Sequence, residues 1–396
     1  MTHRNVLIAG AGIAGPALAH WLGRHGMQAT LVERASAPRE GGQTVDLRGA
    51  GRDVARKMGL ERTLRAHATR EEGIRFVNAA NRIKAAFASG AFSGQGPIAD
   101  LEILRADLSR ILNEDTHPHT EYLFGDEITQ LSDTGKRVDV TFRNGPDRVF
   151  DLVVAADGAR SRTRDLTFGD ITDIRPVGLT TAYFTIPRQP SDGSWARWHN
   201  TTQGRTATLR PDNQGTTRAC LSYLSPPRGD ERLAPDEQKQ LLRRLFAGAG
   251  WEIPRILTAM DTADDFFLDS ATQIRMPAWS RGRIAVIGDA AYCASPLSGM
   301  GTSLALVGAY ILAGELAHHA HHSNAFARYE HLLRPYVTRA QQLPRGVPRI
   351  AFPRTRVGIQ TLNTVLRAAS RPHIAKALNR FLVPPADTFK LPPYGL

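Results

Sequence analysis

Cysteine is scarce in this chain of 396 residues, which has only Cys220 and Cys293. The two lie far apart, and neither belongs to a Cys-x-x-Cys pair or to a Cys/His ligand spacing. Their placement excludes a disulfide framework and a structural zinc site. None of the 13 histidines has a metal-ligand spacing either, so we expect no bound metal.

Long apolar runs are also missing. No stretch approaches the roughly 18 to 20 uninterrupted apolar residues that a membrane span needs. The sequence has no low-complexity tract and no internal repeat. We therefore expect a globular, cytoplasmic protein that has no membrane partner.

Lysine occurs only six times, so the net charge of +12 rests almost entirely on arginine. The arginines are scattered along the chain and are not massed with interleaved aromatic residues, as they would be at a nucleic-acid interface. We expect no nucleic-acid partner. The positive charge would instead raise the local concentration of small anionic ligands, which affects rate and not identity.

A glycine-rich turn lies close to the N-terminus, after the apolar run at residues 6–9. Gly10 lets the chain turn sharply, Gly12 removes a side chain that would block a pyrophosphate, and Gly15 lets a helix pack closely on the strand. Glu33 ends the next apolar run, where a carboxylate can accept hydrogen bonds from a ribose diol. Although glycine turns also occur for geometric reasons alone, this strand–helix–strand context indicates a dinucleotide clamp.

The length exceeds what one hydrophobic core usually serves, so we expect more than one domain. The predicted fold class is α/β, with a Rossmann-type dinucleotide-binding domain, an inserted mainly β domain and a C-terminal helical segment. The predicted boundaries are 1–72, 101–172 and 277–330 for the binding domain, 73–100 and 173–276 for the inserted domain, and 331–396 for the extension.

Local patterns predict several elements. Residues 73–88 favour a hairpin that turns at Asn81, and Asn144-Gly145 favours a second hairpin turn. Helical periodicity is expected over 102–112, over one helix near 235–247 in the inserted domain, and near 324–342 and 359–382. Pro335 should kink or end the first of the last two helices, and the basic tail could be a solvated cap.

Three motifs follow one another in this chain: GAGIAG at residues 10–15, Asp157-Gly158 after a buried run, and Gly288-Asp289 followed by the loop 296–301. In that order they resemble the class A flavin-dependent monooxygenases, the family of para-hydroxybenzoate hydroxylase. Residues 41–60 and 105–112 resemble most closely the tetracycline-inactivating and polyketide-hydroxylating members. The resemblance covers about residues 4–330.

The resemblance implies a bound FAD. Glu33 and Arg34 would contact its adenosine, Arg105 its ribityl and phosphate region, and Asp289 a ribityl hydroxyl. The backbone amides of Gly299 and Gly301 would approach the isoalloxazine edge, where donors stabilise negative charge. The full set of expected cofactor-binding residues is Gly10, Gly12, Ala14, Gly15, Glu33, Arg34, Arg39, Asp46, Leu47, Arg105, Asp157, Gly158, Gly288, Asp289, Pro296, Gly299, Met300, Gly301 and Thr302.

Alternative readings stay open for some of these residues. Arg105 could form a surface salt bridge, and Arg39 and Asp46 could be ordinary loop charges. The chain has no second GxGxxG motif, and the family binds NADPH, or NADH, transiently in a surface groove. Two positions depart from the tetracycline-inactivating members, because Tyr292 stands where they usually have His and Met300 where they usually have Gln.

The family mechanism implies that NADPH reduces FAD, that the reduced flavin and O2 give a C4a-hydroperoxide, and that one oxygen atom passes to an electron-rich small molecule, aromatic or polyketide-like. No catalytic acid or base is needed, and we name none. The inserted sheet would supply the opposite wall of the pocket, although aromatic residues on a sheet are more often core than ligand contacts. Its candidate substrate contacts are Trp198, His199, Arg210, Tyr223 and Phe267.

Other functions remain possible on the same fold. One is a flavin-dependent reductase or dehydrogenase, and another is a flavoprotein that binds and sequesters a ligand without turnover. A halogenase is less favoured, because the segment 195–198 does not match the WxWxIP pattern. We expect a monomer in which the tail packs on its own chain.

Overall fold

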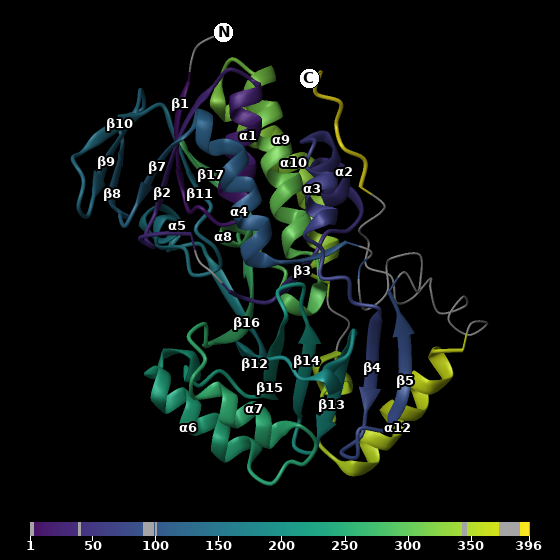
Figure 1. The fold of residues 1–396 in the computed structure, drawn as a ribbon. Coiled ribbons are helices and arrows are strands. Elements are labelled where there is room, and N and C mark those ends of the chain that lie inside the picture. Colours follow the sequence, from purple (N-terminus) through teal and green to yellow (C-terminus); the bar gives the residue numbers. More distant parts are fainter. Residues whose placement is uncertain are drawn as a thin grey trace.

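A twisted, mostly parallel six-stranded sheet forms the centre of one layer of the computed structural model (Figure 1). The structure describes residues 4–38, 41–89, 99, 101–342, 347–371 and 389–395. Neighbouring strands are parallel except β17, which pairs antiparallel at the edge. The strands in spatial order are β17 (Ser280–Arg281), β18 (Ile284–Val286), β11 (Leu152–Ala155), β1 (Asn5–Ala9), β2 (Gln28–Glu33) and β7 (Glu121–Phe124).

Helices cover this sheet, as continuous apolar strands require. Helix α9 packs against α1, α2 and α10, and its side chains are almost all buried. Within the described residues, no helix has the length and apolarity needed to cross a bilayer. The helices of this layer are α1 (Ala14–Arg24), α2 (Gly49–Lys57), α3 (Glu61–Ala66), α4 (Arg105–Thr116), α5 (Arg162–Phe168), α8 (Asp289–Tyr292), α9 (Gly301–His318) and α10 (His322–Ala340).

Two smaller sheets flank this layer. The strands β8 (Ile128–Asp133), β9 (Val138–Phe142) and β10 (Arg148–Phe150) form an antiparallel meander with the predicted turn at Asn144-Gly145. A two-stranded sheet pairs β3 (Thr44–Asp46) with β6 (Glu102–Leu104). Residues 102–104 are therefore a strand and not the first turn of the predicted helix. Their run of three residues is too short for periodicity to distinguish the two structures.

A seven-stranded sheet forms the second layer, below the first in Figure 1. The predicted 73–88 hairpin joins it through a parallel pairing of β4 with β13, while its other pairs are antiparallel. Asn81 takes the left-handed conformation of a tight turn, with φ 56°. The strands in order are β16 (Phe267–Arg275), β12 (Asp173–Pro187), β15 (Thr216–Leu224), β14 (Arg205–Pro211), β13 (Trp195–Thr201), β4 (Gly73–Val77) and β5 (Ile83–Ala88).

Two helices, α6 (Pro235–Phe246) and α7 (Ile253–Met260), pack on one face of this sheet. The prediction of a single helix in the inserted segment was wrong. The helical run stops after α6 because Ala247 is extended and Gly248 has φ 67°, and the chain then begins a second helix. The other face of the sheet is turned toward the first layer.

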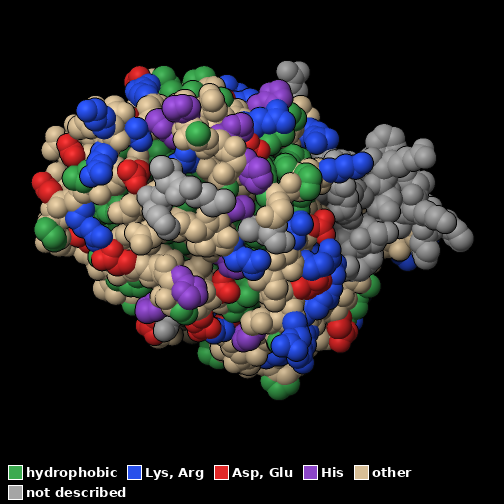
Figure 2. Space-filling view, turned by 90° about the horizontal axis from the view of Figure 1, so that it is seen from above, with side chains coloured by type: hydrophobic (Ala, Val, Ile, Leu, Met, Phe, Trp, Pro, Cys, Tyr) green, Lys and Arg blue, Asp and Glu red, His purple; other side chains and the backbone are tan. Residues whose placement is uncertain are grey.

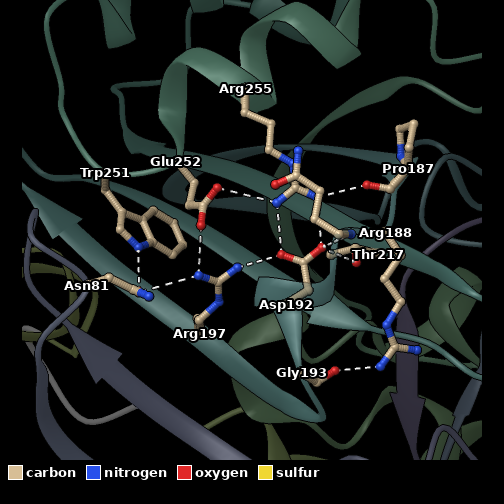
Figure 3. Close-up of polar contacts among 11 residues, drawn as sticks. Asn81, Pro187, Arg188, Asp192, Gly193, Arg197, Thr217, Trp251, Glu252 and Arg255 are labelled. Carbon is tan, nitrogen blue, oxygen red and sulfur yellow. Dashed lines mark hydrogen bonds and ion pairs between the residues drawn. The ribbon is translucent and has the colours of Figure 1, made fainter.

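A buried charge cluster ties the lower end of this sheet to α7 (Figure 3). Asp192 accepts hydrogen bonds from Arg197 at 2.6 Å, from Arg255 at 2.7 Å and from the Thr217 hydroxyl at 3.0 Å. Burial raises the pKa of Asp192, but the hydrogen bonds from Arg255, from the Gln189 amide and from Thr217 hold it below its usual value. Because both carboxylate oxygens of Asp192 are satisfied, the cluster is a structural joint.

The C-terminal part of the chain crosses both layers. Helix α10 continues through Pro335 to Ala340. The expectation that Pro335 could end this helix was therefore wrong. Buried Leu333, Tyr336 and Val337 fix this stretch of helix against the core. Helices α11 (Val347–Ala351) and α12 (Arg356–Ala369) follow, and α12 packs on β5 and β13. The part of the predicted 359–382 helix beyond residue 371 lies outside the described residues.

Candidate functional site

The glycine turn has the close approaches that its sequence predicts. Gly10 has φ 104°, and a Cβ there would stand 2.7 Å from the carbonyl oxygen of Ala156. A Cβ on Gly15 would fall far inside van der Waals contact with the carbonyl oxygen of Gly10. A Cβ on Gly12 would stand 3.5 Å from Nη2 of Arg105, so this guanidinium lies directly above the turn. The turn thus brings bare backbone and a cation together at the N-terminus of α1.

Glu33, at the end of β2, lies beside the same turn. Its carboxylate accepts hydrogen bonds from the amides of Ala11 and Ala35, both at 3.0 Å. These two bonds fix the carboxylate where an acid of this motif meets a ribose. Arg34 beside it is exposed. Arg39 lies outside the described residues.

Asp289 stands where two motifs meet. Gly288 has φ 63°, and a Cβ on it would stand only 2.9 Å from the Cβ of Ala14 in α1. Burial raises the pKa of the Asp289 carboxyl, while the charge of Arg105 lowers it. A Cβ on Gly301 would stand 3.7 Å from Oδ1 of Asp289. The structure therefore brings Ala14, Arg105, Gly288, Asp289 and Gly301 into one site.

The loop 296–301 closes this site and leads into α9. Residues Pro296–Ser298 form a 3₁₀ turn, and Gly299 follows with φ 61°. A Cβ on Gly299 would stand 3.5 Å from a carboxylate oxygen of Asp46 on β3. Met300 is fully buried, and Thr302 lies in the first turn of α9. The N-terminal end of this helix thus lies in the same site as Asp289 and the glycine turn, which favours negative charge there.

The Asp157-Gly158 motif supports the site from behind. The Asp157 carboxylate accepts from the Ser161 hydroxyl and, at 3.2 Å, from the Thr163 amide. Arg164, almost fully buried, donates to the carbonyl oxygens of Ala159 at 3.0 Å and of Ala290 at 3.2 Å. The side chain of Arg164 therefore connects this motif to the Gly288-Asp289 turn by hydrogen bonds. The sequence analysis did not predict this role of Arg164.

Asp46 is the last residue of β3 and lies beside Gly299, and Leu47 follows it. Leu47 is buried in the core, and Asp46 accepts from Arg48 at 2.7 Å. The backbone amide of Arg48 donates a hydrogen bond to the Ser303 hydroxyl of α9 at 3.2 Å, which holds this segment against the helix. Sequence reasoning missed Arg48, although its position within the family-like segment 41–60 was a usable signal.

The expected substrate contacts separate into two faces of the seven-stranded sheet. Alternation along β14 and β15 places Arg210 toward the first layer, whereas Tyr223 packs with the core under α6 and α7. The Tyr223 hydroxyl donates to Asp230 at 2.9 Å. The structure therefore places Tyr223 in the core under α6 and α7, because its side chain lies on the same face of β15 as Leu221.

The remaining three have mixed surroundings. Trp198 packs near Phe76 and Phe352, with ring centroids 6.0 Å and 5.8 Å away. Phe267 is partly exposed and stacks on Tyr183 at 5.0 Å. His199 is buried, and one ring nitrogen lies 3.0 Å from the carbonyl oxygen of Val77. Its contacts are those of a sheet-packing residue.

The departure at Tyr292 concerns packing. Its ring is buried between Trp279 and α9, and its hydroxyl accepts from that of Tyr329 at 3.1 Å. Gly308 provides the room, since a Cβ there would overlap the Tyr292 hydroxyl. Among the described residues, no group of three or more His, Cys, Asp or Glu side chains is arranged to hold a metal ion.

The surface charge is mixed on the face seen in Figure 2, where lysine and arginine are interspersed with acidic side chains and histidines. Many of the arginines are paired, such as Arg160 with Asp269 at 2.6 Å and Arg148 with Glu121 at 2.7 Å. The net charge of +12 is therefore distributed over a surface on which many arginines have an acidic neighbour.

The site fits an adenine dinucleotide of the flavin type. Two buried polar groups near it are not fully satisfied by the described residues. The side-chain oxygen of Gln43 accepts no hydrogen bond, and burial disfavours the charge of the Asp289 carboxylate. Bare backbone at Gly12, Gly299 and Gly301 leaves space beside them. Both groups are hydrogen-bond acceptors, so they are satisfied by a ligand that carries hydroxyl donors, such as a ribose or a ribityl chain.

The fold and this site define a dinucleotide-binding protein of the flavoprotein type. A family model described as an FAD binding domain matches residues 3–346. The chain therefore belongs to that family, and within it to the class A flavin-dependent monooxygenases, which confirms the resemblance, the α/β fold class and FAD as the cofactor.

Individual relatives cover nearly the whole chain. It is 40% identical to an uncharacterised protein of Mycobacterium tuberculosis over 87% of this chain and 95% of that protein. It is 36% identical to the flavin-dependent monooxygenase eupH of a Phoma species over 95% and 94% of the two chains. The solved structure of tetracycline destructase Tet(55) superposes with a TM-score of 0.84 at 34% identity, over 100% of both chains.

Arg105→Ala should weaken FAD binding roughly tenfold or more, because a guanidinium at the glycine turn makes charge-assisted hydrogen bonds to phosphate. The measurement is titration of the apoprotein with FAD by flavin fluorescence. Arg110→Ala is the matched control on the same helix, since Arg110 is exposed and pairs with Glu114 at 2.9 Å. Equal FAD affinity in wild type and Arg105→Ala would leave Arg105 as a salt-bridge residue.

Proposed function

We propose that this chain uses FAD and NADPH, or NADH, to insert one oxygen atom from O2 into a small aromatic or polyketide-like molecule. The observation that carries the proposal is that the glycine turn, Asp289 and the loop 296–301 meet in one site. The likeness to Tet(55) over the full length of both chains supports a polyketide-like substrate. When bound, FAD supplies the redox chemistry with the nicotinamide and O2, which no side chain can provide.

The residues of the chain bind and orient the cofactor. The amides around Gly12 and the N-terminus of α1 bind the diphosphate, and Glu33 accepts from the adenosine ribose. Arg105 reaches the phosphate and ribityl region, and Asp289 accepts from a ribityl hydroxyl. The amides of Gly299 and Gly301, together with the N-terminus of α9, favour negative charge at the flavin edge.

The seven-stranded sheet provides the substrate wall and keeps water out. Arg210, Trp198 and Phe267 are the proposed contacts, with Tyr223 supporting the wall from its far face. We assign residues 1–72, 101–172 and 277–330 to the cofactor domain, 73–100 and 173–276 to the substrate domain, and 331–396 to a C-terminal extension. We further propose a cytoplasmic monomer, in line with two unpaired cysteines and a tail that packs on its own chain.

Purified yellow protein should oxidise NADPH faster when a substrate is present, and should consume O2 and add one oxygen atom to the product. Tetracycline is the first probe, followed by other phenolic polyketides. The measurements are NADPH absorbance, oxygen uptake and the product mass under ¹⁸O2. Turnover that continues without O2 would identify a reductase, and binding without any turnover would identify a sequestering protein; either result overturns the proposal.

A further inference from the structure

A buried ion cluster joins the two layers of the molecule. Arg210 on β14 donates from Nε and Nη2 to the two oxygens of Glu71, at 3.1 Å and 2.8 Å. The same Nη2 donates to Glu102 on β6 at 2.5 Å. The side chains of Glu71 and Glu102 are only 1% and 5% exposed. Two buried carboxylates thus share one guanidinium.

The cluster lies directly behind the residues assigned to the flavin edge. Glu102 pairs in register with Asp46 across the small sheet β3·β6, and α4 begins at Arg105, three residues after it. The Asp46 carboxylate in turn approaches Gly299 of the loop 296–301. A change in charge at Glu102 therefore alters the electrostatic potential at the cofactor site, through Asp46 and the strand that leads to Arg105.

The surroundings of Glu102 favour its protonated form. Burial, aided by the neighbouring charges of Glu71 and Asp46, raises the pKa of Glu102 to about 8 against the opposing charge of Arg210. The Thr69 hydroxyl also faces this carboxyl, with its oxygen 3.4 Å from Oε2. A proton on Glu102 therefore removes one negative charge from this buried cluster.

We propose that Glu102 is a positioning residue that holds a proton at neutral pH, anchors Arg210 against the sheet, and adds one negative charge behind the flavin edge when its O–H bond breaks and the proton leaves to solvent. The cluster around Arg210 therefore carries one more negative charge at alkaline pH than at neutral pH. This inference rests on the proposed function, because it takes the site formed by the glycine turn, Asp289 and the loop 296–301 to be the flavin site.

The visible absorption spectrum of the holoenzyme tests the inference without any substrate. Between pH 6 and 9 the wild-type flavin band should shift in a single-proton transition with its midpoint near 8. Glu102→Gln keeps an acceptor for Arg210 but cannot ionise, so its flavin band should stay constant. A wild-type spectrum that does not change, or a Glu102→Gln protein with the same transition, would overturn the proposal.

The pH dependence of unfolding gives a second readout. Because the pKa of Glu102 is raised on folding, the stability that its proton provides is present at low pH and lost as the pH rises toward 8. From pH 6 to 8 the unfolding constant of wild type should rise roughly 50-fold more than that of Glu102→Gln. Equal pH profiles for the two proteins would contradict the proposal.

Two further variants complete the design. Glu72→Gln is the matched control, since the exposed Glu72 carboxylate binds Ser194 and Trp195, both at 2.6 Å, and should keep the wild-type transition. Arg210→Gln covers the case in which Glu102→Gln does not fold, because loss of the cation should move the midpoint above 8. An unmoved midpoint would overturn the proposal. A protein that binds FAD and shows the transition but oxidises no substrate refutes the proposed function alone.

Discussion

Asp289→Ala protein should purify almost colourless, with FAD affinity lowered roughly 10- to 100-fold. The Asp289 carboxylate is buried at the start of α8, and burial raises its pKa. A cofactor hydroxyl that donates to it satisfies a group that otherwise sits at a cost in the interior. Hydrogen bonds to a charged group contribute about 1.5–3 kcal/mol each, which corresponds to that loss in affinity. The measurements are the flavin absorbance per protein and the titration of the apoprotein with FAD.

Asp289→Asn is the control for this change. The amide has the same shape and retains one oxygen acceptor, so its flavin content should fall between those of wild type and Asp289→Ala. Both variants should keep the wild-type circular dichroism spectrum, since no described backbone group depends on the carboxylate. If Asp289→Ala is as yellow as wild type, Asp289 does not hold the ribityl chain.

The sequence was sufficient to predict the parts of the site that rest on local geometry. The run 6–9, the spacing of Gly10, Gly12 and Gly15, and the acid at Glu33 each impose a backbone requirement that few other residues meet, and the structure meets it. The hairpin at 73–88 was likewise readable from the local sequence pattern. Short-range patterns carry this information because the responsible atoms are neighbours in the chain.

Contacts between distant segments were not predictable. The Arg210–Glu102 pair joins residues 108 positions apart, and nothing in either segment marks the other as a partner. Tyr223 shows the same limit, because strand alternation divides side chains between two faces but does not say which face the helices cover. The site residues that sequence reasoning missed, such as Glu71 and Glu102, belong to this long-range class.

The end of the chain was the least predictable part. Residues 389–395 pack on the first layer, where the Tyr310 hydroxyl donates to the carbonyl oxygen of Pro392 at 2.7 Å and Tyr394 is buried beside Glu315. Gly314 makes room for the Tyr394 ring. The described part of the tail is therefore a packed segment, and the expectation of a solvated cap was wrong for it. A single glycine inside a long apolar helix did not reveal this partner.

Gly15→Ala should have the largest effect on stability for the smallest change, a single methyl group. A Cβ at this position would overlap the carbonyl oxygen of Gly10 and would stand 3.0 Å from Leu31. Backbone cannot yield as a flexible side chain can, so α1 must move away from β1. We expect a loss of about 3 kcal/mol or more, a melting temperature lower by about 5 °C or more, and little bound flavin because the amides at the turn no longer converge.

Gly23→Ala tests whether this loss comes from the position or from the residue type. Gly23 lies in the same helix α1, and a Cβ there would have no neighbour within 4 Å. Alanine should therefore stabilise the helix by about 0.5–1 kcal/mol and leave FAD binding unchanged. The two variants, compared by thermal melting and by flavin content, separate helix propensity from steric approach. A Gly15→Ala protein that melts at the wild-type temperature and stays yellow would show that α1 and β1 do not need the contact on which the cofactor site is built.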